Sequence, residues 1–274
     1  MPLRLNFNYE AASAQRHLGL TQASYFKTVE RLSSGLRINR AADDAAGLSI
    51  SEKLGNQVRG LNQAQRNAQD AISLIQTAEG ALNNSHAILS RMRELAVQAA
   101  SDTLTTADRV SIQAEAAQLI SELSRIANTT QFNTKVLLDG TYCSTGLVFE
   151  IGANAGQSLT LCIGAATATA LGVDAVSLSS QSSADAAITT IDGAISAVSS
   201  ARGTLGAMQN RMEHISTFLG VASENTEAAR SRIRDADVAK ESAEMVRVQI
   251  LQQAAAAVLA QANQAPQLAL TLLR

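Results

Sequence analysis

The chain has 274 residues, of which 46% are hydrophobic and only 3% aromatic, and its formal net charge is −2. The near-neutral charge and the lack of basic runs exclude the electrostatic signature of a nucleic-acid-binding protein or of one held on an anionic membrane. The scarcity of aromatic residues argues against the wide core of a compact enzyme and favours closely packed helices. No apolar run approaches the ~20 residues of a membrane span, and the N-terminus predicts no cleavable secretory signal.

The first helix that the sequence predicts covers residues 12–34. Residues recur along it in alternating steps of four and three, which is the period of a coiled-coil seam, and Gln22 is its polar member. The apolar members are Leu18, Tyr25, Val29 and Leu32. Gly35 then suits the left-handed conformation that ends a helix. Residues 36–43 follow as a polar linker, and Asp43 or Asp44 is the expected N-cap of the next helix.

Two further helices follow the linker. One is expected from Asp44 to about Ala100, with an apolar line at the same spacing. The next opens at Thr105, which together with Asp108 forms a variant of the capping box. Because a short loop joins these helices, we expect an antiparallel hairpin, to which residues 205–232 add a third member.

The middle of the chain has the pattern of a β-hairpin. Residues 147–151 and 159–163 are short β-type runs, and the turn cluster between them centres near Asn154. The chain has two cysteines, too few for a disulfide framework. We expect Cys143 and Cys162 to be small core or strand residues rather than a disulfide, because this turn places Cys162 opposite about residue 147.

A last helix is expected from Ala186 onward, continuing without a break through residues 205–274. The seam spacing persists along it, and its predicted assembly positions are Ile233, Ala236, Ala243, Ile250, Ala254 and Ala257. Beyond Ile233, further apolar residues lie off this line, so a single partner helix cannot bury them all. A tail with two apolar faces indicates that other copies of the chain, or another protein, cover it.

Residues of catalytic or metal-binding type show no pattern that indicates chemistry. The histidines have no metal-ligand spacing and are His17, His86 and His214. Asp235 and Asp237 fall inside the expected helix, where their carboxylates would point to different faces. Nucleotide-binding and nucleophile motifs are absent from the sequence. We therefore expect no enzyme activity, no cofactor and no metal site.

Several long segments at both ends of the chain resemble bacterial flagellins. At the N-terminal end these are residues 31–39 (RLSSGLRIN), 42–50 (ADDAAGLSI), 67–80 (NAQDAISLIQTAEG) and 91–99 (RMRELAVQA). At the C-terminal end they are residues 233–241 (IRDADVAKE), 249–254 (QILQQA) and 260–274 (AQANQAPQLALTLLR). The resemblance covers almost the whole chain in the right order, so it is far more specific than any single short motif.

The resemblance implies a mainly α fold, in which long coiled-coil helices from both termini accompany a helical bundle with a small β-hairpin region. Residues 1–42 and 233–274 would form the two halves of an inner coiled-coil domain, and residues 43–232 the middle domain. The short connection after Gly172 implies a flagellin without outer variable domains. The two cysteines depart from the family, whose members mostly lack cysteine.

The resemblance also implies a function and partners. The chain would be exported unfolded by the flagellar type III system, assisted by an export chaperone, and would polymerise outside the cell into a helical filament that transmits motor torque. Hook-associated and cap proteins would be its other flagellar partners, with no nucleic acid or membrane partner. Terminal segments that cannot bury their apolar surface alone fit folding on assembly, because only assembly offsets the entropy lost on ordering them.

Two sets of residues match positions at which host receptors recognise flagellins. Arg91, Leu95 and Glu115 match a contact with Toll-like receptor 5, although the same positions also suit an interface or a solvated face. Leu270, Leu272 and Leu273 match leucines recognised by cytosolic inflammasome sensors, with packing in the inner core as their primary expected role.

Three rival functions differ in what the chain would need. A hook–filament junction protein is the alternative that shares both terminal patterns, but the C-terminal ending favours flagellin. A flagellin-like surface enzyme would need a catalytic insert, and residues 173–186 leave no room for one. A coiled-coil scaffold would not need a type III exporter.

Overall fold

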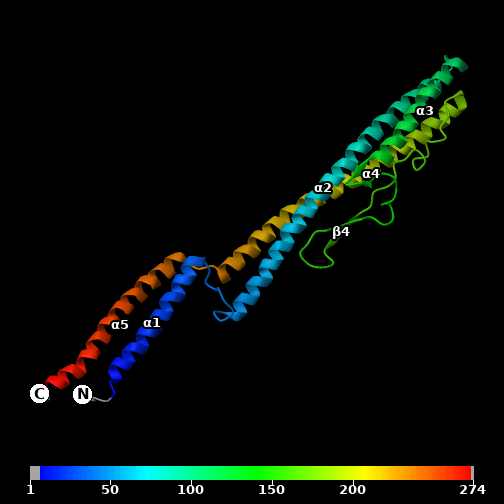
Figure 1. The fold of residues 1–274 in the computed structure, drawn as a ribbon. Coiled ribbons are helices and arrows are strands. Elements are labelled where there is room, and N and C mark those ends of the chain that lie inside the picture. The colour runs from blue at the N-terminus through cyan, green and yellow to red at the C-terminus, as the bar shows by residue number, and fades with distance from the viewer. Residues whose placement is uncertain (1–6, 273–274) are drawn as a thin grey trace. The chain divides into compact units, whose positions relative to one another are not determined.

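The computed structural model describes residues 7–272, and for residues 265–272 it describes only the backbone. In this range the chain is mainly helical, which confirms the predicted fold class (Figure 1). The helices are α1 (Tyr9–Ser34), α2 (Ala45–Ala99), α3 (Thr106–Thr129), α4 (Gln181–Arg234) and α5 (Val238–Leu272). The strands are β1 (Gln131–Phe132), β2 (Lys135–Val136), β3 (Leu147–Glu150) and β4 (Ser158–Leu161).

Contacts between Cα atoms divide the chain into two compact units. The first combines Met1–Asn56 with Asn225–Arg274, and the second is Gln57–Glu224. The division into 1–42, 43–232 and 233–274 stays a prediction. In the part of the chain that the structure describes, no helix combines the length and apolarity needed to span a membrane.

In the first unit, α1 and α5 lie side by side although they come from opposite ends of the chain (Figure 1). The side chain of Asn8 caps α1 by accepting a hydrogen bond from the N–H of Ala11. Gly35 ends α1 in the left-handed conformation, with φ of 69°, as its sequence position predicted. The linker after it is not helical, and Asp44 caps α2 by accepting from the N–H of Gly47.

The expected unbroken helix over the last part of the chain is wrong, because the helix breaks at residues 235–237. Asp237 is an N-cap: its carboxylate accepts hydrogen bonds from the N–H groups of Ala239 and Lys240. Asp235 pairs with Leu36 in an isolated β-bridge. The two carboxylates therefore belong to a helix boundary rather than to the faces of one helix. A helix-type hydrophobic pattern persists across the break, which is why the pattern alone does not reveal it.

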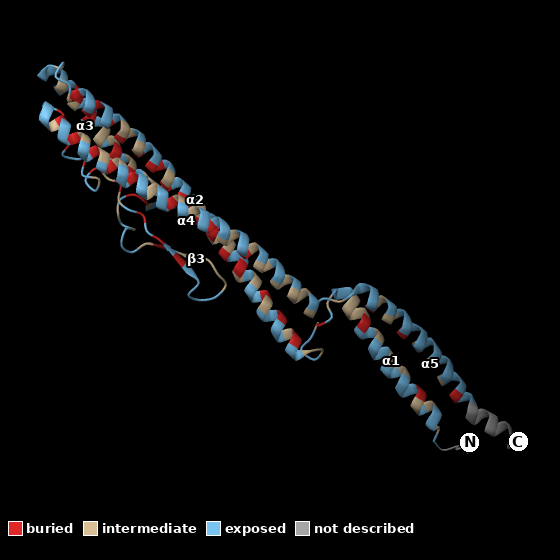
Figure 2. Cartoon of the chain, turned by 180° about the vertical axis from the view of Figure 1, so that it is seen from behind, coloured by how far each residue is buried: buried red, intermediate tan, exposed pale blue. Residues whose placement is uncertain are grey.

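The second unit is a helical bundle with a large apolar core and a small separate apolar cluster formed by Leu61, Ala64 and Leu219. Residues of α2, α3 and α4 pack together in the large core, and buried residues recur along these helices, in red in Figure 2. Leu89, Leu123 and Ile191 are among the fully buried members. The predicted capping box at the start of α3 is present, since Thr105 and Asp108 each accept a hydrogen bond from the backbone N–H of the other.

The β-type residues form two separate two-stranded antiparallel sheets. β1 pairs with β2 through a two-residue loop, in which Asn133 and Thr134 have positive φ values of 47° and 66°. β3 pairs with β4, with Leu147 opposite Leu161, and this confirms the predicted hairpin. Leu147 and Leu161 are buried and join the bundle core.

The sequence predicted core or strand positions for the two cysteines, and this prediction is wrong. Cys143 lies in a turn before β3, and Cys162 directly follows β4. Both are exposed and have free thiols. The apolar positions of the hairpin are filled by its leucines, so the flanking cysteines remain in solvent.

Candidate assembly surface

The contact between α1 and α5 is built from two rows of residues, each with coiled-coil spacing. The row on α1 is buried or half-buried and consists of Ala11, Ala14, Leu18, Thr21, Tyr25, Thr28 and Leu32. The matching row on α5, here called the inner line, consists of Glu241, Met245, Val248, Gln252, Ala255, Leu259 and Ala262. Both rows step by three and four residues, so each helix presents one face to the other.

Polar contacts fix the register of the two helices along their length. The amide of Asn8 donates to the carbonyl of Ala262 at 2.8 Å, near the ends of the chain. At the other end of the helix pair, the guanidinium of Arg31 lies 3.3 Å from the carboxylate of Glu241. Glu241 is buried, and this ion pair gives its charge a partner away from water.

The predicted assembly positions fall into two groups in the structure. Leu18, Tyr25 and Leu32 lie on the row of α1 that faces α5, and Val29 lies half-buried beside it. On α5, in contrast, the predicted positions are not those that face α1. A residue two places from Val248 is turned by about 200° around a helix, so Ile250 points to the opposite side.

The opposite side of α5 carries a second apolar row, here called the outer line. Its members are all exposed and are Ala243, Val246, Ile250, Ala254 and Ala257. Val246 is 50% exposed and Ile250 is 61% exposed. Figure 2 shows α5 mostly in the colour of exposed residues. The inner line is thus covered by α1, while no described residue covers the outer line; the predicted role of the outer line in assembly stays a prediction.

Ile233 and Ala236, the remaining predicted positions, lie half-buried at the break between α4 and α5. The linker after α1 holds this break by hydrogen bonds. The N–H groups of Arg37 and Ile38 donate to the carbonyl of Arg234, and the guanidinium of Arg37 donates to the carbonyl of Ile233 at 2.5 and 3.1 Å. The last carbonyls of α4 thus find donors outside their own helix.

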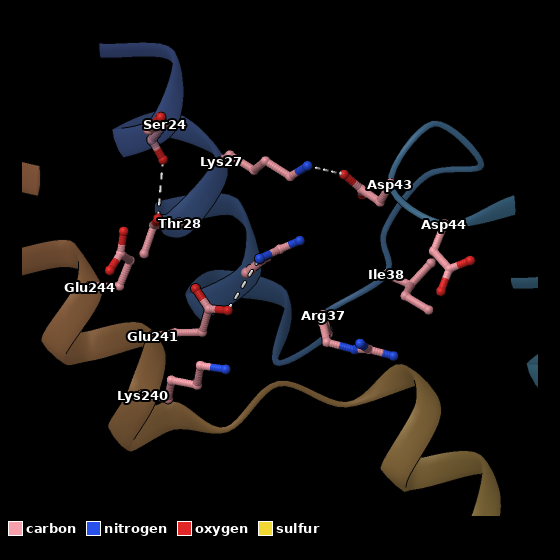
Figure 3. Close-up of a pocket in the computed structure, with 11 residues that line it drawn as sticks. Ser24, Lys27, Thr28, Arg37, Ile38, Asp43, Asp44, Lys240, Glu241 and Glu244 are labelled. Atoms are coloured by element: carbon pink, nitrogen blue, oxygen red, sulfur yellow. Dashed lines mark hydrogen bonds and ion pairs between the residues drawn. The ribbon is translucent and has the colours of Figure 1, made fainter. Parts of the chain in front are cut away.

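These contacts surround a charged cavity of about 650 Å³ within the first unit (Figure 3). Its lining includes side chains of both signs from α1, the linker and the first turns of α5. The ammonium group of Lys27 lies 2.7 Å from the carboxylate of Asp43 (Figure 3). This bond, with the N–H groups of Arg40 and Asn39, lowers the pKa of Asp43 from 3.8 to about 2. The cavity therefore holds internally paired charges, which stabilise the linker.

Sequence reasoning missed the residues that make this junction. Arg37 and Glu241 lie inside the quoted motifs, but their long-range partners are not readable from local spacing. The one available signal was Asp237, a residue type favoured at N-caps, placed just before α5. Among the described residues, no group of three or more His, Cys, Asp or Glu side chains is placed to hold a metal ion.

The residues predicted to contact Toll-like receptor 5 lie in the second unit. Arg91 is exposed, and its guanidinium donates to Glu115 at 2.9 and 3.0 Å and to Glu94 at 3.0 Å. The carboxylates of Glu94 and Glu115 raise the pKa of Arg91. Leu95 is buried in the bundle core, with 1% of its surface exposed. Arg91 and Glu115 are therefore exposed, whereas Leu95 is buried, and the receptor contact of all three stays a prediction.

The predicted inflammasome-sensor positions cannot be placed in the same way. Leu270 and Leu272 belong to the backbone of α5, but their side chains lie outside the described residues, and so does the whole of Leu273.

Comparisons with known proteins agree over almost the full length of the chain. Residues 5–143 match the model of the bacterial flagellin N-terminal helical region, and residues 188–273 match that of the bacterial flagellin C-terminal helical region. A flagellin of Halalkalibacterium halodurans is 51% identical over 272 residues, which cover 98% of this chain and 99% of that relative. A flagellin of Bacillus subtilis is 46% identical over 306 residues, covering 99% of this chain and all of that relative.

Solved structures show the same resemblance. The crystal structure of Bacillus cereus flagellin is 35% identical with a TM-score of 0.50, and the match covers 56% of this chain and 88% of that one. The structure of a putative flagellar hook-associated protein from Vibrio parahaemolyticus shares the fold, with a TM-score of 0.59 at 16% identity, covering 70% of this chain and all of that one.

Proposed function

The chain belongs to the bacterial flagellin family and is a structural subunit of the flagellar filament, and we propose that its copies pack together through the outer line of α5. One observation supports this proposal above all others. α5 carries apolar residues on two opposite sides, and α1 covers only one of them. A second copy of the chain would remove the outer line from water.

The geometry of such a contact suits a filament. A helix face that meets a different face of the next copy makes a heterologous contact, and contacts of this kind that do not close into a ring produce an open helical polymer. The burial of Val246 and Ile250 would then contribute to the free energy of assembly rather than to folding of the single chain. The inner line would hold the two chain ends together inside each subunit.

Membership of the family also supports inferences about the export, the location and the partners of the subunit. We infer export in an unfolded state by the flagellar type III system with the help of an export chaperone, an extracellular location, and contact with hook-associated and cap proteins. The work of the filament is then mechanical, since it transmits motor torque, and the chain is not an enzyme. Recognition by Toll-like receptor 5 through Arg91 and Glu115 is proposed on the same basis, because both side chains are exposed.

Seeded polymerisation of the purified chain tests the assembly surface. We expect the full chain to form long tubes on filament seeds, visible by negative-stain microscopy and recovered by sedimentation. A Val246→Gln variant should raise the critical concentration. Val246 is half exposed, so about half of the ~1.5–3 kcal/mol of a fully buried valine remains to be gained, or about 1 kcal/mol and roughly fivefold in concentration.

The matched control is Val148→Gln. Val148 is the same residue type with similar exposure, 59% against 50% for Val246, but it lies on β3 rather than on α5. Equal effects of the two substitutions would refute an assembly role specific to the outer line. Short caps or discrete oligomers from the unmodified chain at every concentration would favour the hook–filament junction protein instead.

A further inference from the structure

We propose that Cys143 and Cys162 form an intramolecular disulfide that ties the turn at residues 140–146 to the end of β4. This inference goes beyond assembly, and it does not depend on the α5 surface. It concerns the only two cysteines of the sequence, both of which are free and exposed.

The register of the hairpin brings Cys162 to this turn. Leu147 pairs with Leu161, so the next residues along each strand are Gly146 and Cys162. A Cβ atom placed on Gly146 would lie 3.4 Å from the Sγ atom of Cys162. The sulfur of Cys162 therefore lies against the turn that contains Cys143.

A backbone hydrogen bond continues the pairing beyond the strands. The N–H of Ile163 donates to the carbonyl of Tyr142 at 3.3 Å. Standard bond lengths place the Cα atom of Cys143 about 2.8 Å from that carbonyl oxygen, and the Cα atom of Cys162 about 2.4 Å from that nitrogen. The two Cα atoms are thus separated by at most roughly 8.5 Å, whereas a disulfide takes up to about 6.8 Å. The two Cα atoms therefore need to approach by at most about 2 Å to reach the separation of a disulfide.

The turn is built to allow such a movement. Gly140 and Gly146 flank it with φ values of 95° and 65°, and apart from half-buried Tyr142 the side chains between them are exposed. The N–H of Cys143 donates to the carbonyl of Gly140 at 3.1 Å. This hydrogen bond closes a single turn, which is not part of a helix or strand. Tyr142 is the member that packs against the bundle core, so the bridge would join a surface turn to a fixed strand end.

Thiol–disulfide exchange with a small-molecule disulfide supplies the oxidation. The thiolate of one cysteine attacks the small disulfide, forms a mixed disulfide and releases one small thiol. The second protein thiolate then attacks the protein sulfur of the mixed disulfide and displaces the second small thiol. In total, two protein thiols lose two protons and two electrons, and one small disulfide is reduced to two thiols. Both exposed sulfurs are accessible to this reaction, which a reducing cytoplasm would suppress and an oxidising exterior would permit.

Intact-mass analysis after incubation with oxidised glutathione tests the proposal. We expect the native chain to lose two hydrogens and to retain no glutathione, and peptide mapping to join the segments around Cys143 and Cys162. Cys143→Ser and Cys162→Ser variants should each retain one glutathione, since neither has a second thiol to displace it. We also expect disulfide formation in the native chain to be favoured at least tenfold over disulfide formation in urea. The measure is the ratio of reduced to oxidised glutathione at which half of the protein is oxidised.

A variant with one cysteine moved tests whether closure depends on the position of Cys143 or only on the flexibility of the chain. Cys143→Ser combined with Asn154→Cys moves one thiol to the hairpin tip, about four strand residues or ~13 Å away from Cys162. This variant should retain two glutathiones. Two retained glutathiones on the unmodified chain, a disulfide-linked dimer, or equal closure in native and urea-unfolded protein would overturn the proposal.

Discussion

Replacing Thr134 by glycine should stabilise the protein, although the substitution removes side-chain atoms. Thr134 is β-branched and occupies the loop between β1 and β2 with φ of 66°. A non-glycine residue in this region carries strain of order 1–3 kcal/mol, and two-residue hairpin loops favour glycine for that reason. Asn133, the other loop residue with positive φ, is of a type that tolerates it.

The expected size follows from three opposing contributions. Relief of about 2 kcal/mol of strain is offset by about 0.5–1 kcal/mol of extra backbone entropy that glycine loses on folding. The hydroxyl of Thr134 donates to the carbonyl of Asn133 at 2.6 Å, but this bond is exposed and contributes about 0.5 kcal/mol. The net gain in the free energy of unfolding is therefore about 0.5–1 kcal/mol.

Urea denaturation followed by far-UV circular dichroism measures this difference. The matched control is Thr145→Gly, since Thr145 is also exposed and also donates its hydroxyl to a backbone carbonyl, that of Thr141, but has no positive φ. Thr145→Gly should destabilise the protein by about 1–1.5 kcal/mol, because it adds backbone entropy to the unfolded chain and removes this hydrogen bond. If both substitutions destabilised it to the same extent, the strain assigned to Thr134 would be absent.

Two further predictions concern the core and the linker. Leu89→Ala, at a fully buried position of the bundle, should lower the free energy of unfolding by about 2–5 kcal/mol. Val97→Ala, at an exposed position of the same helix, should change it by less than about 0.5 kcal/mol. Urea denaturation of both variants measures the difference. The lowered pKa of Asp43, about 2 against 3.8, means that its charge stabilises the linker above pH 3.8 and that this contribution is lost as the pH falls through 2. Amide hydrogen exchange of residues 36–44 should therefore differ between the unmodified chain and Asp43→Asn at pH 5 and converge towards pH 2, and a difference independent of pH would contradict the assignment.

The sequence determined the local structure of this protein and its family. Gly35 ended α1, Thr105 and Asp108 formed the capping box, and the long helices followed their apolar periodicity, because each of these signals acts within a few residues. The motifs at both ends sufficed to identify the flagellin family. The sequence also correctly indicated that α5 is apolar on more than one side.

Only the tertiary structure decided which side of α5 is buried and where the last helix breaks. Ile250 and Val248 are both apolar and two residues apart, so periodicity alone accepts either as the seam, and only the packing of α1 selects Val248. At the break at residues 235–237, the carbonyls of Ile233 and Arg234 accept hydrogen bonds from Arg37 and Ile38, nearly 200 residues earlier in the chain. The burial of Leu95 and the exposure of Cys143 and Cys162 likewise depend on which neighbours fill the core. Local propensity cannot encode such choices, because the groups that decide them are distant in sequence and meet only on folding.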